Sequence, residues 1–155
     1  MVDAIQQYVN DTTYLAGLDT TLSTNYSGIP AAAALAKTTD EVILCVGTDL
    51  SSAHEEMDAV NVTFPAGQWA LLQAVAAAAK KPITVVIMTA VPLDISKVLA
   101  LKNVGAVIHT GQPSVQTLGI GDVIFGDKVP AGRLIQTVMP EAYAAEVPTP
   151  PNMHT

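Results

Sequence analysis

The sequence predicts an α/β domain, a three-layer αβα sandwich with a mainly parallel sheet. Two apolar runs, residues 41–47 (EVILCVG) and 83–88 (ITVVIM), are rich in β-branched residues and show no alternation with polar ones. Such continuous runs are typical of strands that are covered on both faces. Helical patterns alternate with these runs along the chain. Because parallel strands need crossover connections, this alternation favours parallel pairing.

Two helices precede the two strands. The first is predicted over residues 29–37 (IPAAAALAK) and the second over residues 67–80 (GQWALLQAVAAAAK). In the second helix, Trp69, Leu72 and Val75 follow i, i+3, i+6 spacing and therefore share one face. That face is expected to pack on the sheet.

The alternation continues to the end of the domain. A third, shorter strand is predicted over residues 106–109 (AVIH), with helices over residues 96–101 and 114–124. After Met139 the sequence is polar and rich in proline, which predicts an extended surface segment over residues 140–155 instead of a helix. We therefore expect one α/β domain over residues 1–139, followed by this tail.

Binding residues in a parallel sheet lie on loops beyond the carboxyl ends of its strands. This rule brings together the loops of residues 48–65, 89–94 and 110–116. The first of them contains most of the chemistry-bearing side chains. Its charged or titratable residues are Asp49, His54, Glu55, Glu56 and Asp58.

The composition of the acidic loop leaves two interpretations open. Its charges either belong to a solvated loop without further role, or supply a carboxyl group for proton transfer. The spacing matches no standard pattern of metal ligands, so a metal site is not expected. His109 ends an apolar strand, where a hydrogen-bonded structural histidine is favoured over a catalytic one.

Charge and hydropathy exclude two classes of partner. The formal net charge is −7, with only seven Lys and Arg residues, so the chain cannot neutralise a nucleic-acid backbone. An acidic surface also disfavours anionic membranes, and no apolar run approaches the roughly 20 residues that span a bilayer. Cys45 is the only cysteine and is expected to be a buried, inert thiol.

Three asparagines stand in N-glycosylation acceptor sequences: Asn10 in NDT, Asn25 in NYS and Asn61 in NVT. These acceptors favour a secreted, extracellular glycoprotein. The first residues, MVDAIQQYVN, contain neither a basic nor an apolar signal segment. A secreted protein is therefore not expected to begin at Met1.

Ordered motifs resemble the second domain of family 3 glycoside hydrolases, especially fungal and plant β-xylosidases. In the first half of the chain, the matching motifs are GTD at 47–49, AHEEMD at 53–58 and NVTFPAGQ at 61–68. Downstream matches are KPITVVIM, VPLDIS, HTGQPSVQ and DVIFGDKVPAGRL, with AIQQYV and PEAYAAEVP near the ends. The resemblance covers essentially the whole chain.

The resemblance implies a division of labour between two domains. A barrel domain supplies an aspartate nucleophile, and the α/β domain supplies a general acid/base, which corresponds to Glu55. Retention of configuration requires the two carboxyl groups to lie roughly 5–5.5 Å apart. The implied substrate is a xylo- or gluco-oligosaccharide, and Asp49, His54, Glu56 and Asp58 are implied to line its site. No cofactor is implied, and the isolated domain is expected to be inactive.

The chain departs from the family pattern around the implied sugar site. Ala53 and Ala59 replace a glutamate and an arginine of the acidic motif, and His109, Gln112 and Ser114 replace a tryptophan, a tyrosine and a glycine. The family's segments after PNMHT are also missing, so the chain is expected to stop before the end of the family domain. These departures leave a second interpretation open, a non-catalytic carbohydrate- or protein-binding module.

Overall fold

The computed structural model describes residues 1–59, 61–113 and 117–146, and its centre is a three-stranded sheet. The strands are β1 (Ile43–Gly47), β2 (Ile83–Met88) and β3 (Val104–Gly111), in the spatial order β1-β2-β3. Both pairs are parallel. The α/β prediction is confirmed, and β2 has the predicted bounds. The third strand is longer than its apolar run because Val104 also pairs with Ile83 and Gly111 with Met88, with register shifts at Gly105 and Thr110.

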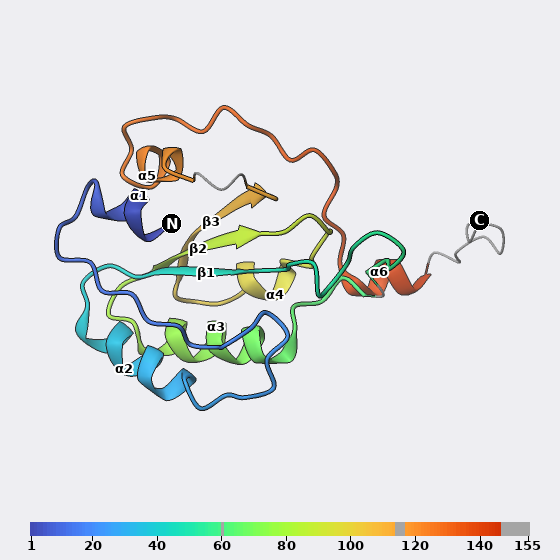
Figure 1. Ribbon diagram of the computed structural model, residues 1–155, viewed down its shortest axis with the longest axis horizontal. Helices are drawn as coiled ribbons and strands as arrows, with labels where there is room; N and C mark the ends of the chain where they lie inside the picture. Colours follow the sequence, from blue (N-terminus) through green and yellow to red (C-terminus); the bar gives the residue numbers. More distant parts are fainter. Residues whose placement is uncertain (60, 114–116, 147–155) are drawn as a thin grey trace.

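Helices flank the sheet on both sides (Figure 1). On one side, α2 (Ile29–Thr38), α3 (Ala66–Ala78) and α4 (Ser96–Leu99) share a core with the strands. On the other side lie α1 (Val2–Gln6) and α5 (Gly119–Ile124). The last helix, α6 (Glu141–Glu146), lies beyond the carboxyl ends of the strands. These ends therefore face a region built from loops and α6.

The main core lies between the sheet and α3. Ile83, Val85 and Ile87 project from one face of β2 and are fully buried, as is Leu72 of α3. Removing apolar side chains of this size from water stabilises the fold by about 1.5–3 kcal/mol each. The predicted face of α3 is partly correct, because Leu72 and Val75 are buried while Trp69 lies half-buried at the margin of the core.

A smaller contact joins α1 and α5 through Tyr8 and Phe125. The Tyr8 ring, which follows α1, stacks on Phe125, which follows α5, with 4.7 Å between ring centroids. The Tyr8 hydroxyl donates to carboxylates of Asp122 at 2.6 Å and Asp127 at 3.1 Å. The bond to Asp122, followed by burial, raises the pKa of Tyr8 well above its ordinary value. The composition of residues 2–6 did not predict α1.

The prediction of an extended, non-helical tail is wrong at its start. Residues 141–146 form α6, which begins directly after Pro140. Proline is compatible with a helix start because its missing N–H would have no partner there. The Glu141 amide instead donates to the Asp94 carboxylate at 3.0 Å, a tertiary contact that local composition does not reveal. Residues 147–155 lie outside the described residues.

The helix expected over residues 114–124 is shorter in the structure, since α5 begins at Gly119; residues 114–116 lie outside the described part.

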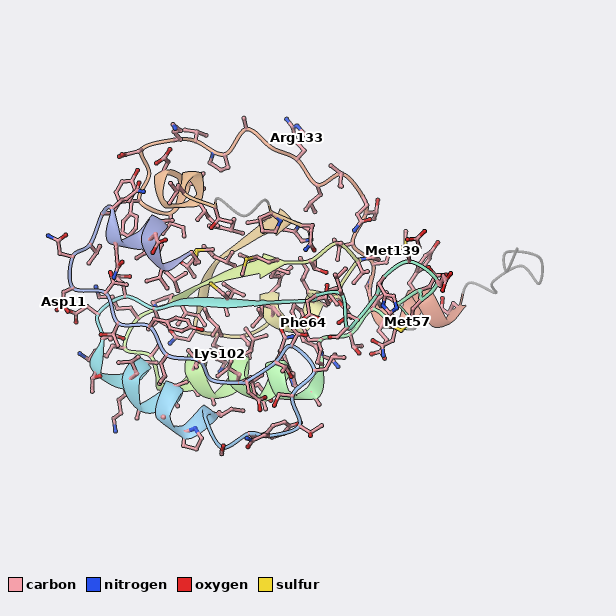
Figure 2. All side chains as sticks on the ribbon, viewed as in Figure 1. Asp11, Met57, Phe64, Lys102, Arg133 and Met139 are labelled. Atoms are coloured by element: carbon pink, nitrogen blue, oxygen red, sulfur yellow. The ribbon has the colours of Figure 1, made fainter. Side chains whose placement is uncertain are left out.

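Across the described ranges, no helix has the length and hydropathy needed to cross a bilayer. Figure 2 shows Met57 on the loop that extends past the strand ends, while Phe64 lies closer to α3. This loop is the acidic loop, residues 48–65.

Candidate functional site

Three loops meet at the carboxyl edge of the sheet, as the sequence predicted. The Thr48 amide donates to the Met88 carbonyl at 3.0 Å, and the Thr89 amide donates to the Gly111 carbonyl at 2.9 Å. The hydroxyls of Thr48 and Thr89 lie 2.6 Å apart. Hydrogen bonds therefore connect the bases of all three loops.

The acidic loop leaves β1 through a backbone geometry that requires glycine. Gly47 has φ +153°, and a Cβ atom placed on it would lie 1.8 Å from the Met88 carbonyl oxygen. A side chain at this position would overlap the backbone of the neighbouring strand. Gly47 thus determines where the acidic loop begins.

Glu55 and Glu56 occupy the tip of a tight turn. The backbones of His54 and Met57 exchange two hydrogen bonds, at 3.0 Å and 2.9 Å. Glu56 has φ 71°, the positive value that a type II turn requires at its third residue. Both glutamates are exposed. The turn therefore presents the Glu55 carboxyl to solvent at the outer end of the loop.

Two other residues of the predicted site stabilise the loop internally. The Asp49 carboxylate accepts a hydrogen bond from the Ser51 amide at 2.9 Å. Hydrogen bonds from the Ser51 hydroxyl and then from this amide lower the pKa of Asp49, so it is a poor proton donor. The His54 ring is 3.0 Å from the Leu50 carbonyl through Nδ1.

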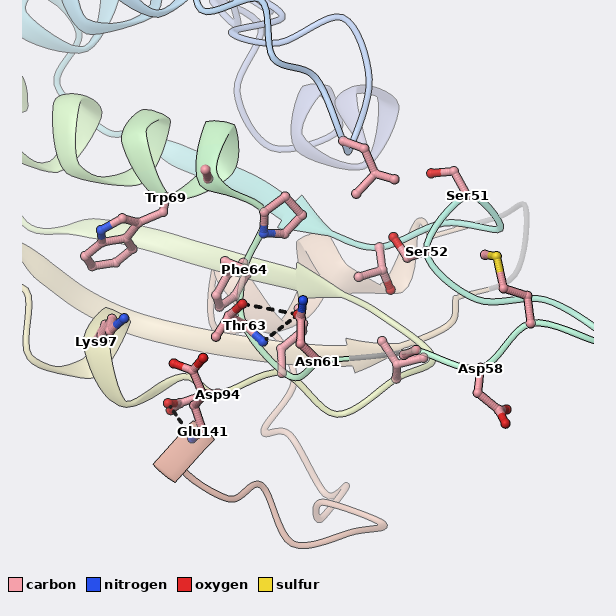
Figure 3. Close-up of a pocket in the computed structure, with 18 residues that line it drawn as sticks. Ser51, Ser52, Asp58, Asn61, Thr63, Phe64, Trp69, Asp94, Lys97 and Glu141 are labelled. Carbon is pink, nitrogen blue, oxygen red and sulfur yellow. Dashed lines mark hydrogen bonds between the residues drawn. The ribbon is translucent and has the colours of Figure 1, made fainter. Parts of the chain in front are cut away.

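A hollow of about 690 Å³ opens between the acidic loop, α3, α4 and the start of α6. Figure 3 shows Trp69 and Lys97 at one end of it and Asp58 with Ser51 at the other. Phe64, Val91 and Leu93 add apolar surface, and Asn61 and Asp94 add polar groups. Of the predicted site residues, Asp58 and Asn61 line this hollow, whereas Asp49, His54, Glu55 and Glu56 do not.

Asp94 lines the hollow and forms hydrogen bonds with the starts of two helices and with the acidic loop. Its carboxylate accepts hydrogen bonds from the Ser96 amide at the start of α4 (2.8 Å) and the Glu141 amide at the start of α6 (3.0 Å). Its own amide donates to Val62 of the acidic loop at 2.6 Å. Burial alone would raise the pKa of Asp94, but the Ser96 and Glu141 hydrogen bonds together with Lys97 outweigh it and lower that pKa.

Asp94→Ala is expected to lower the free energy of unfolding by about 0.5–2 kcal/mol at pH 7, because two helix starts lose their acceptor. A lowered folded-state pKa means that the carboxylate contributes fully above its unfolded value of about 3.9 and loses this contribution as pH falls further. Urea unfolding at pH 7 and pH 3 should show the variant and the parent converging in acid. Asp11→Ala, an exposed carboxylate, is the control. A gap that stays constant with pH would contradict the assignment.

His109 has one satisfied ring nitrogen. Its Nδ1 accepts a hydrogen bond from the Gly111 amide at 3.2 Å, which agrees with the predicted structural role. Its buried Nε2 has no hydrogen-bond partner in the described part of the chain. Within the same part, no group of three or more His, Cys, Asp or Glu side chains is arranged to hold a metal ion.

Trp69, Asp94 and Lys97 also line the hollow, although the sequence patterns did not indicate this. For Asp94 a signal was present, since an Asp two residues before a Ser at a helix start often accepts that backbone amide. Trp69 was assigned to the core by its spacing. The margin of the core and the wall of the hollow coincide there, and periodicity cannot separate them.

Residues 1–153 match the model of the glycosyl hydrolase family 3 C-terminal domain. The chain is 36% identical over 143 residues to probable beta-D-xylosidase 7 of Arabidopsis thaliana, covering 92% of this chain and 18% of that protein. It is 37% identical over 128 residues to exo-1,4-beta-xylosidase xlnD of Aspergillus niger, covering 81% of this chain and 16% of that protein.

Solved structures give the same result. A GH3 exo-beta-xylosidase, XlnD, in complex with a xylobiose aziridine activity-based probe, matches with TM-score 0.86 and 32% identity, over 94% of this chain and 19% of that one. A beta-glucosidase from Kluyveromyces marxianus in complex with glucose matches with TM-score 0.58 and 26% identity, over 66% of this chain and 12% of that one. This chain thus spans about a fifth or less of these relatives.

Proposed function

The chain belongs to the glycosyl hydrolase family 3 C-terminal domain family, and from this premise we propose that it supplies the acid/base to a retaining, exo-acting β-glycosidase of the β-xylosidase kind. The observation that carries the proposal is the family match over residues 1–153 combined with a loop that presents Glu55 beyond the strand ends. The domain of this family normally accompanies a barrel domain.

The proposed reaction needs two carboxyl groups from two domains. A carboxylate of the barrel attacks the anomeric carbon, while Glu55 donates a proton to the departing glycosidic oxygen. Glu55 then takes a proton from water as that water releases the sugar from the covalent intermediate. The proton balance closes within one turnover, because the same carboxyl group acts first as acid and then as base.

A general acid must hold its proton at the working pH, which requires surroundings less polar than open water. Glu55 is exposed in this chain. The proposal therefore requires the barrel domain to cover the turn of His54–Met57 and to bring its nucleophile to roughly 5–5.5 Å from Glu55. It follows that this chain by itself is expected to be inactive.

The proposed substrate is a short xylo- or gluco-oligosaccharide. The names of the relatives, β-xylosidases and a β-glucosidase, support this class. Asp49, His54, Glu56 and Asp58 are proposed to surround the sugar site with Glu55. Asp58 also faces the hollow that contains Trp69, an aromatic wall of the kind that sugar rings contact.

Reconstitution tests the proposal. The barrel domain of the Aspergillus niger relative, produced without its own C-terminal domain, is mixed with this chain and assayed on 4-nitrophenyl β-xyloside. Hydrolysis is expected from the mixture and from neither part alone. A mixture in which size-exclusion chromatography shows a complex, but no hydrolysis occurs, would contradict the catalytic role.

That contrary outcome is the one expected of the second candidate, a non-catalytic carbohydrate- or protein-binding module. The observation that favours it is the exposed Ala59, which lines the hollow where the family motif has an arginine. The reconstituted complex therefore separates the two candidates directly.

We also propose that the chain belongs to a secreted glycoprotein. Asn10, Asn25 and Asn61 are all exposed. Asn61 Oδ1 accepts hydrogen bonds from the Thr63 amide and hydroxyl, both at 3.2 Å, and the Asn61 amide nitrogen, where a glycan would attach, has no hydrogen-bond partner among the described residues. Mass spectrometry of the native protein before and after endoglycosidase should show a loss of mass at these residues. An unchanged mass would contradict glycosylation.

A further inference from the structure

Gln68 of α3 contacts the residue from which the acidic loop departs. Its Oε1 accepts a hydrogen bond from the Gly47 amide at 2.8 Å, and its Nε2 donates to the Gly47 carbonyl at 2.6 Å. Its Nε2 also donates to the Thr21 carbonyl at 2.8 Å. The side chain is 3% exposed. Both donors of this amide are therefore used, and the two bonds to Gly47 are buried, while the bond to Thr21 is partly buried.

The position of Gly47 at the end of an edge strand explains why a side-chain amide is needed beside it. β1 is an edge strand of the described sheet, so the outer peptide groups of its last residue have no strand beside them. The Gln68 amide pairs with both groups of Gly47 as a neighbouring strand would. No other neutral side chain except asparagine offers both an acceptor and two donors, and asparagine is one methylene shorter.

The contact between Gln68 and Gly47 lies where the acidic loop leaves β1. Gly47 has a positive φ of +153°, and Thr48, the first loop residue, forms hydrogen bonds with Met88 and Thr89. Gln68 therefore forms hydrogen bonds on one side of the chain where the loop begins, and Met88 and Thr89 form them on the other side. The direction in which the chain leaves the sheet determines where the tip, eight residues after Gly47, can lie.

We propose that Gln68 is a positioning residue for the acid/base: through Gly47 it holds the acidic loop in the orientation that brings Glu55 to the glycosidic oxygen. This inference rests on the proposed function. Gln68 does not touch the substrate, and its effect is transmitted by the backbone of the loop. Removing its amide leaves the Gly47 N–H and carbonyl buried without partners.

The test uses three variants of the whole chain. Gln68→Met keeps the volume and removes all three hydrogen bonds, and Gln68→Glu keeps an acceptor but loses the donors. Gln73→Met, on the exposed side of the same helix, is the matched control. Amide hydrogen exchange at Gly47 and Thr48 in the folded chain is expected to accelerate at least about 10-fold in Gln68→Met and to stay unchanged in the control. Gln68→Glu is expected to accelerate it less, because its carboxylate still accepts the hydrogen bond from the Gly47 amide.

The second measurement compares two substrates in the chain reconstituted with the barrel. A poor leaving group such as methanol needs the acid, whereas 2,4-dinitrophenolate departs without it. Gln68→Met is expected to lower kcat/KM, which reports the bond-breaking first step, at least about 10-fold more for the methyl β-xyloside than for the dinitrophenyl β-xyloside. Equal losses on both substrates would overturn the proposal, because a merely structural defect reduces the amount of active enzyme for both.

Unchanged exchange at Gly47 and Thr48 would overturn the proposal independently of activity. The failure of the proposed function is recognised separately: Glu55→Gln would then show no leaving-group dependence in the same assay. Should Gln68→Met fail to fold, Gln68→Glu supplies both measurements, since it retains the bond from the Gly47 amide.

Discussion

Glu55→Gln is expected to lower kcat/KM for 4-nitrophenyl β-xyloside about 10²–10⁴-fold in the chain reconstituted with a barrel domain. Glutamine has nearly the same shape but cannot donate or accept the catalytic proton. Glu55 is exposed at a turn and accepts no hydrogen bond among the described residues. The substitution should therefore leave the stability of the chain unchanged, so that any loss reflects chemistry.

Glu56→Gln is the comparison variant, because Glu56 is the neighbouring carboxylate in the same turn and is also exposed. Since Glu56 is proposed to line the sugar site but not to carry the catalytic proton, this substitution should lower kcat/KM by no more than a few fold. Adding azide should restore turnover of an activated substrate in Glu55→Gln, since this anion attacks the covalent intermediate without help from a base. Loss of activity in Glu56→Gln instead of Glu55→Gln would transfer the acid/base role to Glu56.

Gly47→Ala is expected to produce the largest loss of stability of any single methyl addition considered. Backbone strain at a positive φ costs about 1–3 kcal/mol, and forcing extra volume into a packed site costs about 1–3 kcal/mol more. The added Cβ would lie 1.8 Å from a backbone oxygen of β2, which cannot move away without breaking the sheet. A total of about 2–6 kcal/mol is a large part of the roughly 5–15 kcal/mol that stabilises a typical domain.

Alanine substitutions at two other glycines distinguish backbone strain from steric overlap as the cause of this loss of stability. Gly111 also has a positive φ (+65°), but an added Cβ meets nothing within 4 Å, so Gly111→Ala should cost only about 1–2 kcal/mol of conformational strain. Gly132 also has open space around it and no positive φ, so Gly132→Ala should be neutral. Urea unfolding followed by circular dichroism measures all three. Equal losses at Gly47 and Gly111 would show that the contact with Met88 is unimportant.

The fold could be predicted from the strand patterns because such a pattern depends only on residues that are adjacent in sequence. The run of residues 83–88 contains only apolar or β-branched side chains, and the strand has the same bounds in the structure. Its neighbour begins at Ile43, two residues later than predicted. The joining of the three loops followed from parallel pairing alone, since parallel strands place their carboxyl ends at one edge.

The errors arose where distant residues decide the structure. Helix α6 begins where the Glu141 amide meets the carboxylate of Asp94, 47 positions earlier. Its proline-rich surroundings indicate the opposite. Trp69 satisfied the helical period of the core, yet its position at the margin of α3 makes it a wall of the hollow. Periodicity describes one helix and cannot report what lies beyond its edge.

By itself, the sequence determined the parallel α/β fold, the family and the loop that contains Glu55. These depend on hydrophobic patterns and on ordered motifs, both of which are properties of short segments. Only the tertiary structure decided that Gln68 pairs with Gly47, that Asp94 joins α4 to α6, and that Asp58 faces the hollow while Glu55 faces solvent. Each of these joins or orients segments far apart in the chain, and their hydrogen bonds form only once packing has excluded water and brought the partners together.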